Sequence, residues 1–131
     1  MSAPVLRQIL LVEDDPDIQT VAKFALEAVG GFRVAICSSG LEALATAPQL
    51  APDLILLDMM MPDLDGVGTL RALRALPDCS ATPVIFMTAK VQPHEVVEYR
   101  ALGALGVIAK PFDPMTLSAS IAGLWEQRDV K

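Results

Sequence analysis

Several kinds of residue are scarce in this sequence, and their scarcity excludes several classes of protein. The 131 residues include two cysteines and one histidine. Cys37 and Cys79 are far apart and lack metal-ligand spacing, so we expect buried, reduced thiols and neither a zinc site nor a disulfide framework. Basic residues are also few, since 10 Lys and Arg against 16 Asp and Glu give a net charge of −6. This charge argues against direct contact with nucleic acid or with an anionic membrane.

Long hydrophobic runs are absent as well. Hydrophobic residues make up 53% of the chain and its mean hydropathy is +0.46. Apolar runs such as 9–12 and 54–57 are nevertheless far shorter than the roughly 20 residues that a membrane-spanning helix needs. No signal-peptide pattern precedes the first run, so we expect no membrane insertion and a cytoplasmic location. The length predicts one domain, residues 1–131 with a core of about 8–126, and no output domain.

The sequence does contain an alternation of short apolar runs with amphipathic stretches. The apolar runs have no polar alternation, which is typical of strands buried on both faces of a sheet. The expected strands cover 9–12, 32–36, 53–58, 83–87 and 106–109. The expected helices cover 16–29, 41–47, 67–76, 93–102 and 114–125, the second of them ending at Pro48. The expected inner stripe of the first helix consists of Ile18, Val21, Ala22, Ala25, Leu26 and Val29.

This order of elements predicts an α/β fold. Strands that alternate with helices form a parallel sheet with helices on both faces. Right-handed crossovers then favour a doubly wound, flavodoxin-like sheet of five strands in the order 2-1-3-4-5.

Polar side chains follow four of the five expected strands. The carboxyl ends of parallel strands meet at one edge of the sheet, and ligands bind there, near the point where strand order reverses. A group of carboxylates without histidine or cysteine suits a hard cation, Mg²⁺ or Mn²⁺. A lysine and a hydroxyl beside such an ion are the groups that phosphoryl transfer uses, because that reaction depends on positioning and charge neutralisation. The residues are Glu13, Asp14, Asp15, Asp58, Thr88 and Lys110.

Considered alone, these residues have ordinary structural explanations. Asp15 precedes Pro16 and is expected to cap a helix. Taken singly, Thr88 would commonly be a surface hydroxyl and Lys110 a solvated amine. His94, near a helix start, is expected to be exposed and without a catalytic role. The convergence of the polar groups on one edge favours a functional site over these separate explanations.

Four blocks of the sequence resemble the receiver domains of two-component response regulators, the chemotaxis-regulator-like superfamily. The blocks are residues 9–16, 54–66, 83–89 and 110–112, and they occur in the family's order and spacing. The resemblance extends from about Ile9 to Trp125. It implies a phosphorylation-dependent switch of a phosphorelay and no conventional enzyme, although such a domain promotes its own phosphotransfer and dephosphorylation. The implied partners are a histidine kinase or histidine phosphotransfer protein and an unidentified downstream protein.

The resemblance also implies which residues carry the chemistry. Asp58 is similar to the phosphoacceptor, which attacks a phosphohistidine and forms an acyl phosphate. Glu13 and Asp14 match the acidic pair that holds Mg²⁺ or Mn²⁺. Asp58 and the backbone carbonyl of Met60 complete the implied set of metal ligands.

Lys110 resembles the lysine that pairs with the phosphoryl oxygens, and Thr88 resembles the hydroxyl that moves to meet them. The Lys110–Pro111 peptide bond matches one that is cis in the family. Val107 departs from the family pattern, because an aromatic ring usually occupies this position and swings inward as the threonine moves. Tyr99, the only tyrosine of the chain, is a candidate to contribute in its place.

Two further expectations concern the lifetime of the phosphoryl group and the docking of its donor. In the family, side chains two positions after the phosphoacceptor and after the threonine border the path of the hydrolytic water. Here they are Met60 and Lys90, neither suited to orient a water molecule, so we expect a long-lived aspartyl phosphate. Phe24 lies off the inner stripe of its helix and is expected to dock the phosphodonor.

Two other functions fit parts of the sequence. Asp63 and Asp65 match the Asp-x-Asp motif of haloacid-dehalogenase-like phosphatases, but that motif directly follows a buried strand, whereas Asp63 follows Pro62 in a loop. A flavodoxin-type electron carrier has the same expected fold, but the acids after the first strand would repel a flavin phosphate. A yellow protein solution would indicate the flavodoxin, and a colourless one the receiver domain.

Overall fold

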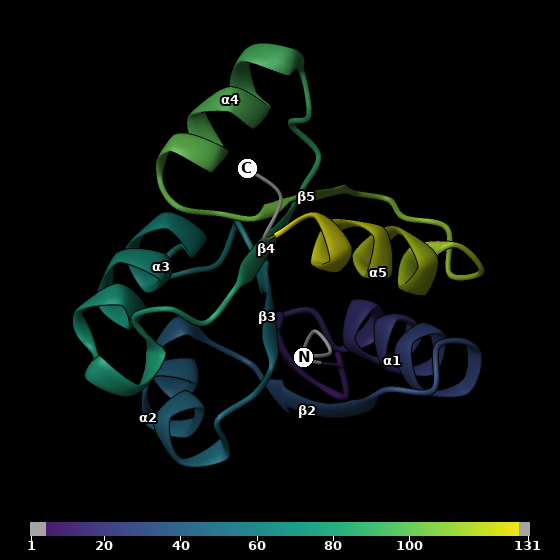
Figure 1. The fold of residues 1–131 in the computed structure, drawn as a ribbon, viewed down its shortest axis with the longest axis horizontal. Helices are drawn as coiled ribbons and strands as arrows, with labels where there is room; N and C mark the ends of the chain where they lie inside the picture. Colours follow the sequence, from purple (N-terminus) through teal and green to yellow (C-terminus); the bar gives the residue numbers. More distant parts are fainter. Residues whose placement is uncertain (1–4, 129–131) are drawn as a thin grey trace.

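The computed structural model describes residues 5–128 and has one parallel sheet with helices on both faces (Figure 1). The expected domain core of 8–126 lies within this range, whereas residues 1–4 and 129–131 of the expected domain lie outside it. The strands are β1 Gln8–Val12, β2 Arg33–Cys37, β3 Leu54–Asp58, β4 Val84–Thr88 and β5 Gly106–Ala109. The helices are α1 Pro16–Phe24, α2 Gly40–Leu50, α3 Gly66–Ala75, α4 Pro93–Ala101 and α5 Leu117–Gln127, with a π-helical turn η1 Ala25–Val29 and a 3-10 turn η2 Pro77–Cys79.

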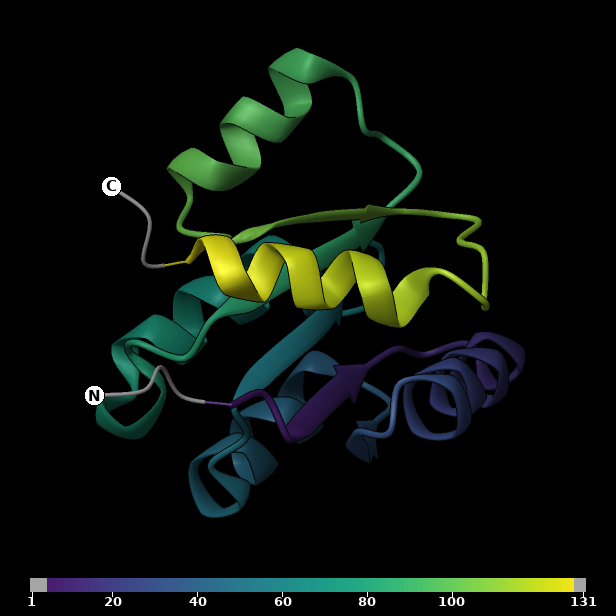
Figure 2. The same ribbon diagram turned by 45° about the vertical axis from the view of Figure 1, so that its right-hand side comes forward.

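The order of the sheet is β2-β1-β3-β4-β5, and all four neighbouring pairs are parallel, which confirms the predicted fold. The helices α1 and α5 lie side by side on one face, and α2, α3 and α4 cover the other (Figures 1 and 2). Successive residues of β1 therefore enter different cores: Ile9 packs toward α1 and α5, and Leu10 toward α2 and α3. Because both faces are covered, the central strands can be apolar throughout.

The first helix differs from the predicted stripe. Val21 and Val29 are 42% and 40% exposed, so they do not belong to the buried side, whereas Ala25 is fully buried. The helix continues past Phe24 as the π turn η1, in which the Gly30 N–H donates to the Ala25 carbonyl at 3.2 Å. The buried Ser118 hydroxyl of α5 donates to the same carbonyl at 2.8 Å. A π turn holds more residues than an α turn, so the α-helical spacing that placed Val29 in the stripe does not apply there. Val21 lies before the π turn, which therefore does not explain its exposure.

The second helix does not end at Pro48, which corrects the prediction. Pro48 lies inside α2, which continues to Leu50 and ends at Ala51 in the left-handed conformation with φ 50°. Proline lacks the N–H that would bond four residues back, so it weakens a helix in its interior. Here it lies in the last turn, and the helix still closes with an Ala51 N–H to Ala47 carbonyl bond of 2.9 Å.

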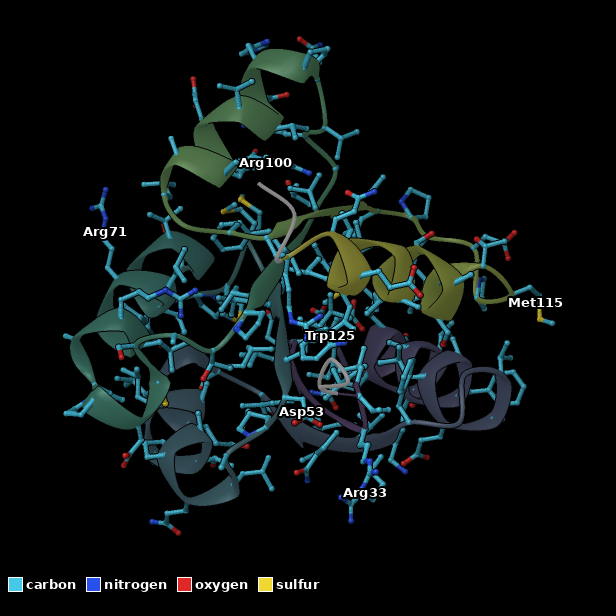
Figure 3. The ribbon with its side chains drawn as sticks, viewed as in Figure 1. Arg33, Asp53, Arg71, Arg100, Met115 and Trp125 are labelled. Atoms are coloured by element: carbon cyan, nitrogen blue, oxygen red, sulfur yellow. The ribbon has the colours of Figure 1, made fainter. Side chains whose placement is uncertain are left out.

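Other boundaries move by a few residues. The last helix begins at Leu117 and not at Pro114, because residues 114–116 form a turn on Asp113, whose side chain accepts the Met115 N–H at 2.8 Å. Met115 itself is exposed (Figure 3). Asp53 lies just before β3 and accepts the N–H groups of Arg7 and Gln8 at 3.0 and 2.9 Å, so it ties the start of β3 to the start of β1.

The two cysteines are free and buried, as predicted. Within residues 5–128, no helix has the length and apolar character needed to cross a membrane.

Candidate functional site

Three carboxylates meet at the carboxyl edge of the sheet. β1 and β3 are direct neighbours, with Val12 opposite Leu57, so the residues that follow these strands are also neighbours. One carboxylate oxygen each from Glu13, Asp14 and Asp58 lies within 4.8 Å of the others. Glu13 and Asp58 are 1% and 2% exposed, whereas Asp14 is exposed. The site thus has two carboxylates in the protein interior and one at its rim.

Lys110, which follows β5, reaches across to two of these carboxylates. Its Nζ lies 2.7 Å from Glu13 Oε1 and 3.0 Å from Asp58 Oδ1. Only the Asp58 contact has hydrogen-bond geometry, so the buried Glu13 Oε1 is in an ion pair but accepts no hydrogen bond. The Lys110–Pro111 bond is cis, as the resemblance implied.

Burial and neighbouring charges change the protonation of the site. Burial is the largest influence on Glu13, and it raises the pKa of this carboxyl to about 7, with a smaller contribution from Asp58. The contact with Lys110 and the Asp15 N–H act in the opposite direction. Burial works to lower the pKa of Lys110, but its contacts with Glu13 and Asp58 outweigh burial and raise that pKa overall. One lysine therefore does not fully compensate the two buried carboxylates.

The carboxylate cluster fits a divalent cation. Its donors are all oxygens, which suits Mg²⁺ or Mn²⁺ and not zinc. Glu13 Oε1 is buried without a hydrogen bond, and burial, which disfavours its charge, raises the pKa of this carboxyl to about 7. A cation beside Glu13, Asp14 and Asp58 would give Glu13 Oε1 a partner and would stabilise the charge of this carboxylate. Met60 lies beside them and donates its N–H to Asp58 Oδ1 at 3.2 Å, and the use of its carbonyl as a ligand stays a prediction.

Thr88 is the last residue of β4 and is 3% exposed. It lies one residue beyond Met87, the residue opposite Asp58 in the pairing of β3 with β4. Its Oγ1 accepts the backbone N–H of Lys90 at 3.1 Å. The structure thus brings Thr88 to the same edge as Asp58, with its hydroxyl engaged by the following loop.

The remaining acids near the site have structural roles. Asp15 caps α1, because its side chain accepts the Asp17 N–H at 2.8 Å, as predicted. Asp65 caps α3 by accepting the Gly68 N–H at 2.8 Å. Asp63 is exposed and has a positive φ of 67°. An Asp-x-Asp nucleophile motif is therefore not formed by Asp63 and Asp65.

Two supporting residues have no counterpart in the sequence-based prediction. The Gln19 side chain donates to the Glu13 backbone carbonyl at 2.6 Å and so fixes the loop after β1. Gly66 lies so close to the loop after β3 that a Cβ there would be 2.7 Å from the Asp58 carbonyl oxygen. The Asp65–Gly66 pair after β3 is a sequence signal for the close approach at Gly66. The Gln19 side chain bonds to a backbone carbonyl, and such a contact leaves no pattern in the sequence.

The response regulator receiver domain family matches residues 9–122 of this chain. The chain belongs to this family. The DNA-binding response regulator MtrA of Mycolicibacterium smegmatis is 36% identical over 115 residues, which are 88% of this chain and 49% of that protein. The alkaline phosphatase synthesis transcriptional regulatory protein PhoP of Bacillus subtilis is 34% identical over 124 residues, 95% of this chain and 50% of that protein. The chain spans about half the length of these curated relatives.

Solved structures lead to the same family. The chemotaxis response regulator CheY4 of Vibrio cholerae has a TM-score of 0.83 and 30% identity, covering 92% of this chain and 99% of that one. The signal receiver domain of a signal transduction histidine kinase from Syntrophus aciditrophicus has a TM-score of 0.78 and 32% identity, covering 95% of this chain and 94% of that one. The chain is therefore a receiver domain of two-component response regulators, a family of signalling switches, which is consistent with control by phosphorylation. MtrA is named for DNA binding, so the expected absence of nucleic-acid contact is not confirmed and stays a prediction.

Proposed function

We propose that a phosphoryl group on Asp58 switches this receiver domain, and that a phosphohistidine on a histidine kinase or a histidine phosphotransfer protein is the donor. The observation that carries the proposal is the Asp58 carboxylate itself. It ends the central strand, it is 2% exposed, and it lies beside two further carboxylates and the Lys110 ammonium. Among the acids of this edge, Asp58 alone contacts Lys110 with hydrogen-bond geometry.

The proposed step is an exchange of a phosphorus–nitrogen bond for a phosphorus–oxygen bond. An Asp58 carboxylate oxygen attacks the phosphorus, and the bond to the donor imidazole breaks. The imidazole keeps the electron pair and takes a proton, while Asp58 becomes an acyl phosphate. Lys110, already at Asp58 Oδ1, pairs with the phosphoryl oxygens, and the Thr88 hydroxyl turns from the loop to donate to one of them. The same groups promote the hydrolysis that returns Asp58 to the free carboxylate.

Glu13, Asp14, Asp58 and the Met60 carbonyl are the residues that would hold Mg²⁺ or Mn²⁺. When bound, such an ion supplies positive charge that offsets the carboxylates and the incoming phosphoryl oxygens. Glu13 has to be ionised for this role, and Lys110 at 2.7 Å favours its ionised form.

The donor is proposed to dock on α1. A groove beside Lys110 is lined by Ile18 and Val21 of α1 and by Phe112. Phe24 lies one helical turn beyond Val21 on the same side of the helix and is 57% exposed. An apolar helix face of the donor would cover these side chains and bring its phosphohistidine to the Lys110 end of the groove.

We infer that the receiver domain formed by residues 5–128 does not itself contact nucleic acid, because the net charge of −6 over the sequence makes such contact unfavourable, and that it signals by contact with a protein surface. A cytoplasmic location agrees with the two free, buried cysteines, since a reducing compartment keeps thiols unpaired.

The test is incubation with acetyl phosphate followed by intact mass. In Mg²⁺ the protein is expected to gain the mass of one phosphoryl group, and in EDTA to gain none. Lys110→Ala should slow the gain, whereas Lys23→Ala, an exposed lysine paired with Glu27 on α1 and η1, should match the wild type. No gain in Mg²⁺, or an equal gain in EDTA, would refute the proposal.

A further inference from the structure

Tyr99 connects α4 to the loop that follows Thr88. It is the one buried residue of α4 and is 9% exposed. Its ring meets the Phe86 ring of β4 edge-on, with 5.7 Å between the centroids and an interplanar angle of 69°. Its hydroxyl donates to the Lys90 backbone carbonyl at 3.2 Å. The helix α4 lies at the β5 edge of the sheet (Figures 1 and 2), and because Tyr99 is its only buried residue, this side chain is its principal anchor.

The same loop residue is bonded to the phosphorylation site. The Lys90 N–H donates to Thr88 Oγ1 at 3.1 Å, while the Lys90 carbonyl accepts the Tyr99 hydroxyl at 3.2 Å. Residues 89–92 are all exposed, so packing holds this loop weakly. The two hydrogen bonds of Lys90 tie the loop to Thr88 and Tyr99, and Gln92 at its end caps α4. A continuous path of hydrogen bonds therefore runs from Thr88 through the Lys90 backbone to α4.

We propose that Tyr99 is a positioning residue that reports phosphorylation of Asp58 to α4 through this path. The inference rests on the proposed function, in which the Thr88 hydroxyl turns toward the phosphoryl group. That turn takes Oγ1 away from the Lys90 N–H, and the released backbone moves the carbonyl to which the Tyr99 hydroxyl is bonded. Because Tyr99 anchors α4, the helix responds.

The core around Tyr99 supports this role. Val107 of β5, where the family resemblance leads us to expect an aromatic ring, packs half-buried against the cluster that contains Tyr99 and Phe86. A valine has no hydroxyl and no ring to exchange between two positions. Tyr99 has both, and its hydroxyl already bonds to the loop that the threonine controls. The aromatic part of the switch is thereby supplied by α4 and not by β5.

The first measurement uses the fact that the chain has a single tyrosine. Protein grown with 3-fluorotyrosine carries one ¹⁹F label, at position 99. We expect its resonance to move when acetyl phosphate and Mg²⁺ phosphorylate the protein, in proportion to the phosphorylated fraction measured by intact mass. An unmoved resonance in fully phosphorylated protein would overturn the inference. Absence of any mass gain would instead refute the proposed function, and the inference with it.

The second measurement separates reporting from packing. Tyr99→Phe keeps the ring and removes only the hydroxyl. This variant should still gain one phosphoryl group, and amides beside Asp58 should still shift, whereas the phosphorylation-dependent amide shifts of α4 should be lost. Ser118→Ala is the matched control, because it removes another buried hydroxyl bonded to a backbone carbonyl, on the opposite face of the sheet. It should keep the α4 shifts. Retained α4 shifts in Tyr99→Phe, or its failure to be phosphorylated, would contradict the inference.

Discussion

The buried Glu13 carboxyl makes the stability of the metal-free protein depend on pH. Its ordinary pKa is 4.5, and burial raises this value to about 7 in the folded protein. The folded state therefore binds the proton more tightly than the unfolded state does, and stability is greatest at low pH within this range. The difference corresponds to about 3 kcal/mol at about 1.4 kcal/mol per pKa unit. In EDTA, the free energy of unfolding should fall by about this amount as the pH rises from about 4.5 to about 8.

Urea unfolding at a series of pH values in EDTA measures this effect. Glu13→Gln keeps the shape of the side chain and cannot ionise, so its free energy of unfolding should lose most of the fall seen in the wild type. Glu98→Gln, which alters an exposed carboxyl of α4, should retain the wild-type dependence. A wild-type stability that stays level or rises over this range would refute the reasoning, as would equal slopes for wild type and Glu13→Gln.

Magnesium should offset this fall in stability. The ion binds the ionised carboxylate, so protons compete with it until the pH exceeds the Glu13 pKa of about 7. The stabilisation that saturating Mg²⁺ gives to the wild type should therefore grow as the pH rises through 7.

Three further outcomes follow from the site. Asp14→Ala should abolish Mg²⁺ binding measured by calorimetry while circular dichroism stays native, because Asp14 is an exposed member of the carboxylate cluster and packs in no core. The aspartyl phosphate should be long-lived, since Met60 is 73% exposed and apolar and Lys90 carries no group suited to orient water. Met60→Asn should shorten the lifetime of the phosphate. A wild-type decay no slower than that of the variant would contradict this prediction. Phe24→Ala should slow phosphorylation by the cognate protein donor by about tenfold, the loss expected for one exposed aromatic anchor, but not phosphorylation by acetyl phosphate. Equal relative rates with both donors would exclude this docking role.

The arrangement of the sheet and its polar edge could be predicted because short stretches of neighbouring residues determine both. Continuous apolar runs marked strands covered on both faces, and the polar residues after them, Glu13, Asp58, Thr88 and Lys110, marked the edge where strand ends meet. Local sequence also gave the helix cap at Asp15. Sequence order and alternation alone determine these features.

The features that could not be predicted depend on contacts between distant segments. The π turn in the first helix shares the Ala25 carbonyl with Ser118, which lies 93 residues further along the chain. Pro48 is tolerated inside α2 because it lies in the last turn of the helix, and the sequence does not reveal that the helix continues to Leu50. The hydrogen bond from the Tyr99 hydroxyl to the Lys90 carbonyl involves a backbone atom, so no pattern of side chains in the sequence predicts it. Contacts between distant segments decided the first of these features, and contacts with backbone atoms the last.

The central claim is that Asp58 is the one phosphoacceptor, and the intact mass of matched variants after incubation with acetyl phosphate and Mg²⁺ tests it most directly. Asp58→Asn keeps the shape of the side chain and removes the nucleophile. Asp63→Asn makes the same change at an exposed acid whose left-handed backbone asparagine accepts. The account predicts one added phosphoryl group on the wild type and on Asp63→Asn, and none on Asp58→Asn. A phosphoryl mass gain by Asp58→Asn would contradict it.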